Sequence, residues 1–184
     1  MVVGGAIGTL AATALTLELI NSLRNPHYIP VCNLNPIFSC SSVMQSHQAQ
    51  AFGFPNEIIG IAGFAAVAAI GVATLAGGRF KPWLWKLVNL GLLGAVAFIT
   101  WLQFETLYRI GALCIFCMVT WVVTIPLFWY VSLYNLQSGH ISFPKPLKRL
   151  GDFFIRHHTD ALLVWFLVII ALVLKRFWYY FGNI

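Results

Sequence analysis

Long apolar runs alternate with polar segments along the chain. A helix needs about 20 residues to cross the hydrocarbon core of a bilayer, and most of the runs reach this length. The predicted spans cover residues 2–23, 57–76, 83–108, 113–134 and 160–174, of which the last is the shortest. The pattern predicts an all-α integral membrane protein that crosses the bilayer five times.

The composition agrees with a membrane protein and excludes an ordinary soluble domain. The chain is 60% hydrophobic and 9% charged over 184 residues, whereas soluble domains carry roughly 25% charged residues. Its mean hydropathy is +0.83. The formal net charge is +6, but the basic residues lie in loops and at span ends, where they act as topology signals. We therefore expect membrane lipid, and no nucleic acid, as the partner of this surface.

The polar segments define the loops. The longest one before residue 135 is 24–56, which is rich in Asn, Pro, Ser and Gln. Within it, residues 41–51 are predicted to form one short helix lying over the bundle, with Phe52 and Phe54 anchoring its end at the interface. Residues 109–112 alone separate the third and fourth spans, so these two spans are predicted to form a tight hairpin.

The basic residues also indicate an orientation, because they gather on the inner side of a membrane. With the N-terminus in the cytoplasm, the inner side holds Arg79, Lys81, Lys86, Lys145, Lys148, Arg149 and Arg156, and the outer side holds only Arg24, Arg109, Lys175 and Arg176. This topology places both cysteine-bearing segments on the outer, extracytoplasmic face. In a bacterium, disulfides persist on that face.

Cys114 and Cys117 stand at the start of the fourth span. Residues three apart share one face of a helix, so Cys117 is predicted to lie deeper and Cys114 nearer water. A thiol in the first helical turn has its thiolate stabilised by the positive end of the helix dipole. The alternative is a pair of buried apolar thiols without a redox role.

Cys32 and Cys40 lie in the loop 24–56, as either a second redox pair or a static structural disulfide. Two pairs on one membrane face suggest a relay, in which electrons move by thiolate attack through mixed disulfides. Electrons arriving at membrane depth need an acceptor, and a lipid-soluble quinone is the natural one. The cysteines have no nearby histidine at ligand spacing, which favours disulfide chemistry over a metal site.

The order and spacing of these residues resemble the vitamin K epoxide reductase family in its bacterial, quinone-dependent form. The resembling features are Cys32 and Cys40 separated by seven residues, the run Ser-Ser-Val-Met-Gln-Ser over 41–46, Asn56 shortly before Ile59-Gly60, and Cys114-Ile-Phe-Cys117. They cover about residues 15–134. The resemblance implies a four-helix transmembrane bundle as the catalytic core, with the fifth transmembrane helix outside it.

The resemblance also implies a role for each matching residue. Cys32 is expected to exchange with an external partner protein, and Cys40 to pass electrons on through a transient disulfide with Cys114. Cys117 is expected to face the quinone, which is menaquinone or ubiquinone. Ser46 is expected to lie near the active-site pair, and Asn56 to hydrogen-bond a quinone oxygen, since polar donors in an apolar pocket orient a carbonyl. The alternatives are a surface hydroxyl for Ser46 and a helix N-cap for Asn56.

Two features depart from parts of the family. Trp121 stands where animal members carry a substrate-contacting tyrosine, so a plain quinone is expected rather than vitamin K epoxide. The chain ends at Ile184 without the thioredoxin-like domain that many bacterial members carry, so the expected partner is a separate DsbA-like thioredoxin-fold protein, as in actinobacteria. The expected organisation is a core over 1–135 with its extracytoplasmic loop 24–56, then a cytoplasmic linker and fifth helix over 136–184.

Three other functions are alternatives to this interpretation. A DsbB-type oxidase carries its Cys-x-x-Cys in the first outer loop, which is the reverse of the order here. A scaffold held by disulfides, without enzymatic activity, is the second alternative, and a metal carrier is the third.

Glu18 is the one acid in the first span. It is expected to be an interfacial acid within reach of Arg24, and the alternative is a functional acid within the membrane.

Overall fold

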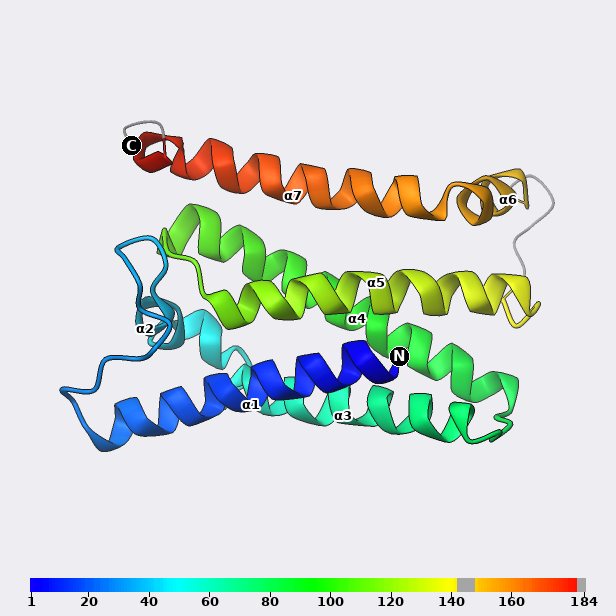
Figure 1. Cartoon of the computed structure of the whole chain (residues 1–184), viewed down its shortest axis with the longest axis horizontal. Coiled ribbons are helices and arrows are strands. Elements are labelled where there is room, and N and C mark those ends of the chain that lie inside the picture. The colour runs from blue at the N-terminus through cyan, green and yellow to red at the C-terminus, as the bar shows by residue number, and fades with distance from the viewer. Residues whose placement is uncertain (142–147, 182–184) are drawn as a thin grey trace. The chain divides into compact units, whose positions relative to one another are not determined.

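The computed structural model describes residues 1–141 and 148–181, and its regular elements are all helical (Figure 1). Lys145, one of the basic residues used to predict orientation, lies outside the described residues. The elements are α1 Val2–Arg24, α2 Cys40–Met44, the 3₁₀ helix η1 His47–Gln50, α3 Asn56–Leu75, α4 Pro82–Glu105, the π-helical turn η2 Thr106–Ile110, α5 Ile115–Gln137, α6 Lys148–Arg156 and α7 His158–Phe181.

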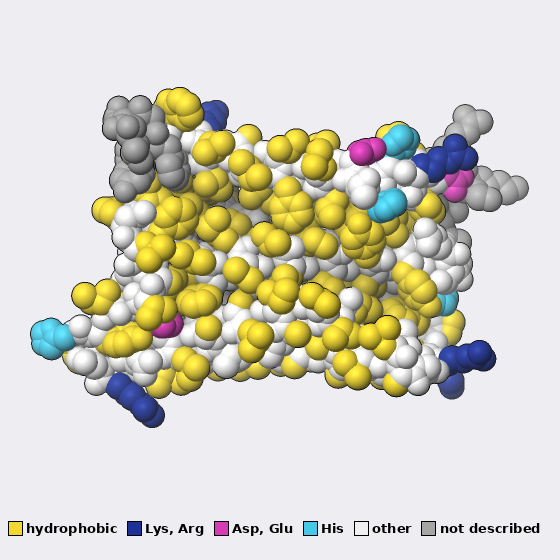
Figure 2. All heavy atoms as spheres, viewed as in Figure 1, with side chains coloured by type: hydrophobic (Ala, Val, Ile, Leu, Met, Phe, Trp, Pro, Cys, Tyr) yellow, Lys and Arg dark blue, Asp and Glu magenta, His cyan; other side chains and the backbone are white. Residues whose placement is uncertain are grey.

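Five of these helices are long and apolar enough to cross a membrane, which confirms the predicted all-α, five-span fold. Hydrophobic side chains cover the middle of the visible helices, and Lys and Arg lie toward helix ends (Figure 2). The expectation that the fifth span is the shortest is wrong, because α7 has 24 residues and α3 has 20. Lys175 and Arg176 end the apolar pattern, but the helical backbone continues through them.

The structure divides into two compact units, Met1–Arg79 with Ala95–Ile125, and Phe80–Gly94 with Pro126–Ile184. In the first unit α1 and α3 pack side by side in opposite directions (Figure 1). Gly8 of α1 lies against the ring of Phe64, and Gly60 of α3 lies against Ala12. Small residues at these positions allow the close approach that apolar helices need in lipid.

In the second unit, polar side chains join the first half of α4 to the last half of α5. Buried Asn135 donates to the carbonyl of Trp85 (3.0 Å), and Asn89 donates to the hydroxyl of Ser132 (2.7 Å). Such bonds satisfy polar groups that lipid cannot.

The segment between α1 and α3 forms two short helices, so the prediction of one helix over 41–51 is wrong. Ser46 separates α2 from η1 with an extended backbone (φ −74°, ψ 150°), and its hydroxyl donates to the carbonyl of Val43 (2.6 Å). This local bond competes with helix continuation, as serine side chains commonly do. Phe52, which follows η1, contacts the ring of Phe98 in α4 (5.4 Å between centroids).

Candidate functional site

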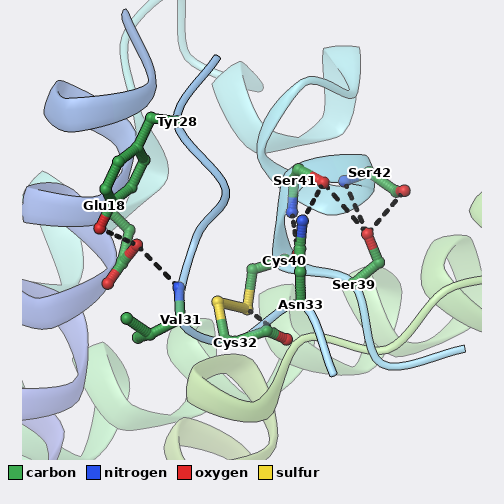
Figure 3. Close-up of a disulfide and its surroundings, with 9 residues drawn as sticks. All are labelled: Glu18, Tyr28, Val31, Cys32, Asn33, Ser39, Cys40, Ser41 and Ser42. Atoms are coloured by element: carbon green, nitrogen blue, oxygen red, sulfur yellow. Dashed lines mark hydrogen bonds between the residues drawn. A yellow bond between two sulfur atoms is a disulfide. The ribbon is translucent and has the colours of Figure 1, made fainter. Parts of the chain in front are cut away.

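Cys32 and Cys40 form a disulfide with a Cα–Cα distance of 5.7 Å (Figure 3). Cys114 and Cys117 are not joined by a disulfide. Cys40 is the first residue of α2, where the side chain of Ser39 accepts a hydrogen bond from the Ser42 N–H. The disulfide therefore joins the loop to the start of a capped helix.

A backbone bridge connects this loop to the Cys-x-x-Cys segment. Phe38 and Leu113 form a parallel β-bridge. The Leu113 N–H donates to the Ile37 carbonyl (2.7 Å), and the Ser39 N–H donates to the Leu113 carbonyl (3.0 Å). The bridge lies two residues before Cys40 and one residue before Cys114, so it holds the two pairs next to each other.

All four cysteines meet in one hydrophobic cluster. Cys32, Cys40 and Cys114 are buried together with Leu15 and Leu19 of α1 and Met44 of α2, and Cys117 packs against them with Val43 and Phe116. Two disulfide-forming pairs within one buried cluster give the short path that thiol–disulfide exchange requires.

Cys114 is fully buried, which the sequence did not predict, and Cys117 is partly exposed. The reason is the loop, whose bridge at Phe38 covers Cys114. Cys114 directly precedes α5. The Cys117 thiol donates a hydrogen bond that lowers the pKa of Cys114; burial opposes this shift, and the backbone N–H groups of Cys117 and Phe116 add to it.

The residues that follow the two loop cysteines also pair with each other. The Asn33 side-chain NH2 donates to the Ser41 hydroxyl (2.8 Å), and the Ser41 backbone N–H donates to the Asn33 side-chain oxygen Oδ1 (3.2 Å) (Figure 3). This reciprocal pair holds the two sides of the loop together beside the disulfide. The sequence interpretation missed it, although a polar residue after each cysteine is a visible signal.

Glu18 fixes the other side of the loop. Its carboxylate is buried, and Oε2 accepts hydrogen bonds from the Tyr28 hydroxyl (3.1 Å) and the Val31 N–H (3.3 Å) (Figure 3). Arg24, which was expected to be within reach of Glu18, is in no salt bridge of the described residues. Because Val31 precedes Cys32, Glu18 positions the disulfide.

Asn56 and Ser46 support the short helices above the cysteines. The Asn56 amide donates to the Gln48 carbonyl (2.6 Å), and its oxygen accepts from the Ala51 N–H (3.2 Å). Pro55 occupies the N-cap position of α3 without a side-chain cap, so the N-cap alternative for Asn56 is wrong. Asn56 retains one amide hydrogen beyond the one it donates to Gln48.

Polar side chains also connect η1 to α4. Gln48 donates to the buried carboxylate of Glu105 (3.1 Å), which Arg109 also contacts (3.4 Å). These bonds connect η1 to the end of α4 and to the π-helical turn that follows it.

Among the described residues, two buried side-chain atoms have no hydrogen-bond partner: Glu57 Oε2 and Gln103 Nε2. An amide donor and a carboxyl group are suitable partners for the two oxygens of a quinone, and the apolar surroundings suit its ring. Trp121, one turn after Cys117, is buried and apolar in the same unit. The residues present therefore fit a quinone.

Comparison with protein-family models matches the vitamin K epoxide reductase family over residues 1–132. Comparison with curated proteins gives no match. The matched range contains all four cysteines, the loop and helices α1 to α4 with most of α5. The chain therefore belongs to the vitamin K epoxide reductase family, whose members are thiol–disulfide oxidoreductases.

Proposed function

We propose that this protein is a quinone-dependent thiol oxidase of the bacterial form of the family. In this proposal it reoxidises a DsbA-like thioredoxin-fold protein and thereby supports disulfide formation. Electrons pass from the partner to Cys32 and Cys40, then to Cys114 and Cys117, and finally to a membrane quinone. Family membership implies the quinone-linked thiol chemistry, and the partner and the direction are the proposed refinements.

The observation that carries the proposal is the meeting of both cysteine pairs in one buried cluster. Their proximity lets electrons pass from the loop pair to the helix pair by thiol–disulfide exchange.

The first step is exchange with the partner. A partner thiolate attacks the Cys32 sulfur, so a mixed disulfide forms and Cys40 leaves as a thiolate. The partner's second thiolate then breaks the mixed disulfide, which leaves the partner oxidised and Cys32 and Cys40 reduced. Because Cys32 is 3% exposed, the loop has to open at the Glu18 contacts for this attack.

The second step moves the same two electrons within the protein. The Cys40 thiolate attacks Cys114 of the oxidised helix pair, forming a Cys40–Cys114 disulfide and releasing Cys117 as a thiolate. Cys32 then attacks Cys40, which restores the loop disulfide and releases the Cys114 thiolate. The hydrogen bonds that lower the pKa of Cys114 make it a good leaving group.

The third step is oxidation of the helix pair, for which a bound quinone, menaquinone or ubiquinone, supplies the two-electron acceptor. Cys117 delivers the electrons, since it is the partly exposed member of the pair. In the proposal, the spare amide hydrogen of Asn56 orients a carbonyl oxygen. Ser46, which separates α2 from η1, keeps these two helices folded beside the site.

We further propose that the protein lies in the cytoplasmic membrane with its N-terminus inside and the cysteines outside. The distribution of basic residues supports this orientation. Residues 1–135 form the catalytic core with loop 24–56, and residues 136–184 form a cytoplasmic linker and a fifth helix.

The test uses purified protein, a short-tailed quinone and a reduced thioredoxin-fold donor. The wild type is expected to consume two donor thiols for each quinone reduced, and Cys114→Ala or Cys117→Ala to abolish both reactions. Cys32→Ala is expected to spare quinone reduction driven by dithiothreitol, which reaches the inner pair directly. Full turnover by Cys117→Ala contradicts the relay, and a disulfide-held scaffold predicts a loss of stability without any electron transfer.

A further inference from the structure

Glu57 is a buried acid that the relay described above does not use. It lies in the first turn of α3 and is 8% exposed, and its Oε2 has no hydrogen-bond partner among the described residues. A buried carboxylate oxygen without a partner is costly to keep. Ionisable groups at such positions in membrane proteins commonly move protons.

The packing of α1 on α3 places Glu57 at the cysteine cluster. The helices run in opposite directions, with Gly71 against Val2 at one end and Gly60 against Ala12 farther along. One more turn along each helix brings Glu57 opposite Leu15. Leu15 packs directly in the cluster with Cys32, Cys40 and Cys114.

The electrostatics of the cysteine pair agrees with this position. The charge of Glu57 raises the pKa of Cys114, against the larger lowering effect of the Cys117 thiol. Glu57 is therefore within electrostatic range of the Cys-x-x-Cys pair. Glu18, one turn beyond Leu15 on α1, is another acid near the cluster, and its carboxylate is already bonded to the loop.

The chemistry of the site requires proton transfer at this place. Oxidation of Cys114 and Cys117 breaks two S–H bonds, forms one S–S bond and releases two electrons and two protons. Conversion of a quinone to a hydroquinone consumes the same two electrons and two protons. The cluster around the cysteines is apolar, so water cannot readily carry these protons.

We propose that Glu57 accepts a proton from the Cys114/Cys117 pair as it is oxidised and passes that proton to a quinone oxygen. Glu57 returns to its starting state after each turnover, so it changes the rate without entering the net reaction. Asn56, its neighbour in the sequence, positions the acceptor oxygen, while Glu57 supplies the proton. This inference rests on the proposed function.

The experiment compares the wild type with Glu57→Gln and Glu57→Asp in single-turnover quinone reduction by the reduced protein. Glu57→Gln keeps the size and polarity of the side chain but cannot carry a proton, so the rate is expected to fall roughly 100-fold, in the range of general acid–base catalysis. The solvent deuterium isotope effect on the remaining rate is expected to rise. Glu57→Asp keeps the acid and is expected to recover part of the rate.

Two controls separate this role from a structural one. Exchange between a reduced donor and the Cys32–Cys40 disulfide involves no quinone, and it is expected to be unchanged in Glu57→Gln. Glu105→Gln neutralises another buried acid, one that has partners, and it is expected to lower the melting temperature without changing the isotope effect.

Infrared difference spectroscopy of the wild type gives a readout that needs neither activity nor a folded variant. A carboxylic acid band is expected to change when the Cys114/Cys117 pair is oxidised without quinone. An unchanged carboxyl band, or a Glu57→Gln variant with wild-type rate and isotope effect, overturns the role of Glu57 alone. A wild type that never reduces quinone overturns the proposed function and this inference together.

Discussion

Leu113 is hydrogen-bonded through its backbone on both sides of Phe38, to the Ile37 carbonyl and to the Ser39 N–H. Because these bonds fix the loop against the Cys-x-x-Cys segment, they determine which cysteines can exchange. Cys40 and Cys114 are each fully buried beside the bridge.

We predict that a variant carrying Cys32→Ala and Cys117→Ala forms a Cys40–Cys114 disulfide readily under mild oxidation. A disulfide needs Cα atoms within roughly 7 Å, and the bridge brings these two segments together. Mass spectrometry of unreduced peptides measures the yield. The matched control carries Cys40→Ala and Cys114→Ala, and an equal yield of its Cys32–Cys117 disulfide would contradict the assignment.

The contacts of Glu18 predict how easily the loop opens. Glu18→Ala removes the acceptor of both the Tyr28 hydroxyl and the Val31 N–H, and bonds to a charged group are worth about 1.5–3 kcal/mol. Reduction of Cys32–Cys40 by a small thiol is therefore expected to accelerate roughly ten- to a hundredfold. Tyr28→Phe, which loses one of these bonds, is expected to have a smaller effect in the same assay.

His27→Ala is the control for this prediction, because His27 is exposed next to Tyr28 and its side chain takes no part in the Glu18 contacts. Its reduction rate is expected to equal that of the wild type. A wild-type rate in Glu18→Ala would show that these bonds do not hold the loop closed.

The sequence predicted the spans well because their signal is local. Each of these apolar runs is longer than a helix of a soluble protein requires and is bounded by polar residues. The helices α1, α3, α4 and α5 therefore begin and end within a few residues of the predictions. The family resemblance likewise identified all four cysteines, which the structure brings together. Both results depend on residue type and spacing rather than on tertiary contacts.

The sequence could not predict contacts made across the fold. Nothing in the sequence around Cys114 indicates that a loop some 75 residues earlier covers it, so its burial was not predicted. Glu18 has Arg24 close in sequence, but its partners come from the returning loop. Glu57 was not recognised at all, because its significance lies in burial without a partner.

The contacts of Cys114 predict a pH dependence of the reduced protein. Since its pKa is lower in the folded protein than in the unfolded chain, ionisation of Cys114 stabilises the fold. This contribution is complete above the ordinary thiol pKa of about 8.5, and it is lost as the pH falls through the lowered pKa. Thermal unfolding of the reduced protein against pH measures it.

Two substitutions at Cys117 test the cause. Cys117→Ala removes the donor that contributes most to stabilising the Cys114 thiolate, so it is expected to raise the pKa of Cys114. Titration monitored by thiolate absorbance measures this pKa. Cys117→Ser keeps a hydroxyl that can donate, so a smaller rise is expected. Equal pKa values in the two variants would exclude the side-chain hydrogen bond as the main cause.

The close contact of α1 and α3 predicts that Gly5→Ala disturbs the redox site from a distance. A Cβ at Gly5 would lie 2.7 Å from the Ala68 backbone nitrogen and 2.8 Å from the Phe64 carbonyl oxygen. Neither backbone atom can move away easily, so overpacking of about 1–3 kcal/mol is expected. Because α1 also carries Leu15 and Leu19 of the cysteine cluster, its displacement is expected to slow formation of the Cys40–Cys114 disulfide as well.

Gly63→Ala is the matched control, since a Cβ at Gly63 in α3 meets nothing within 4 Å. Alanine is the better helix former by roughly 0.5–1 kcal/mol, so this variant is expected to be at least as stable as the wild type. Melting temperature in detergent and the disulfide yield are measured together for both variants. A Gly5→Ala protein that unfolds at a lower temperature but keeps the wild-type yield would show that the cysteine cluster does not depend on α1, because the overpacking would then be confined to the helix pair.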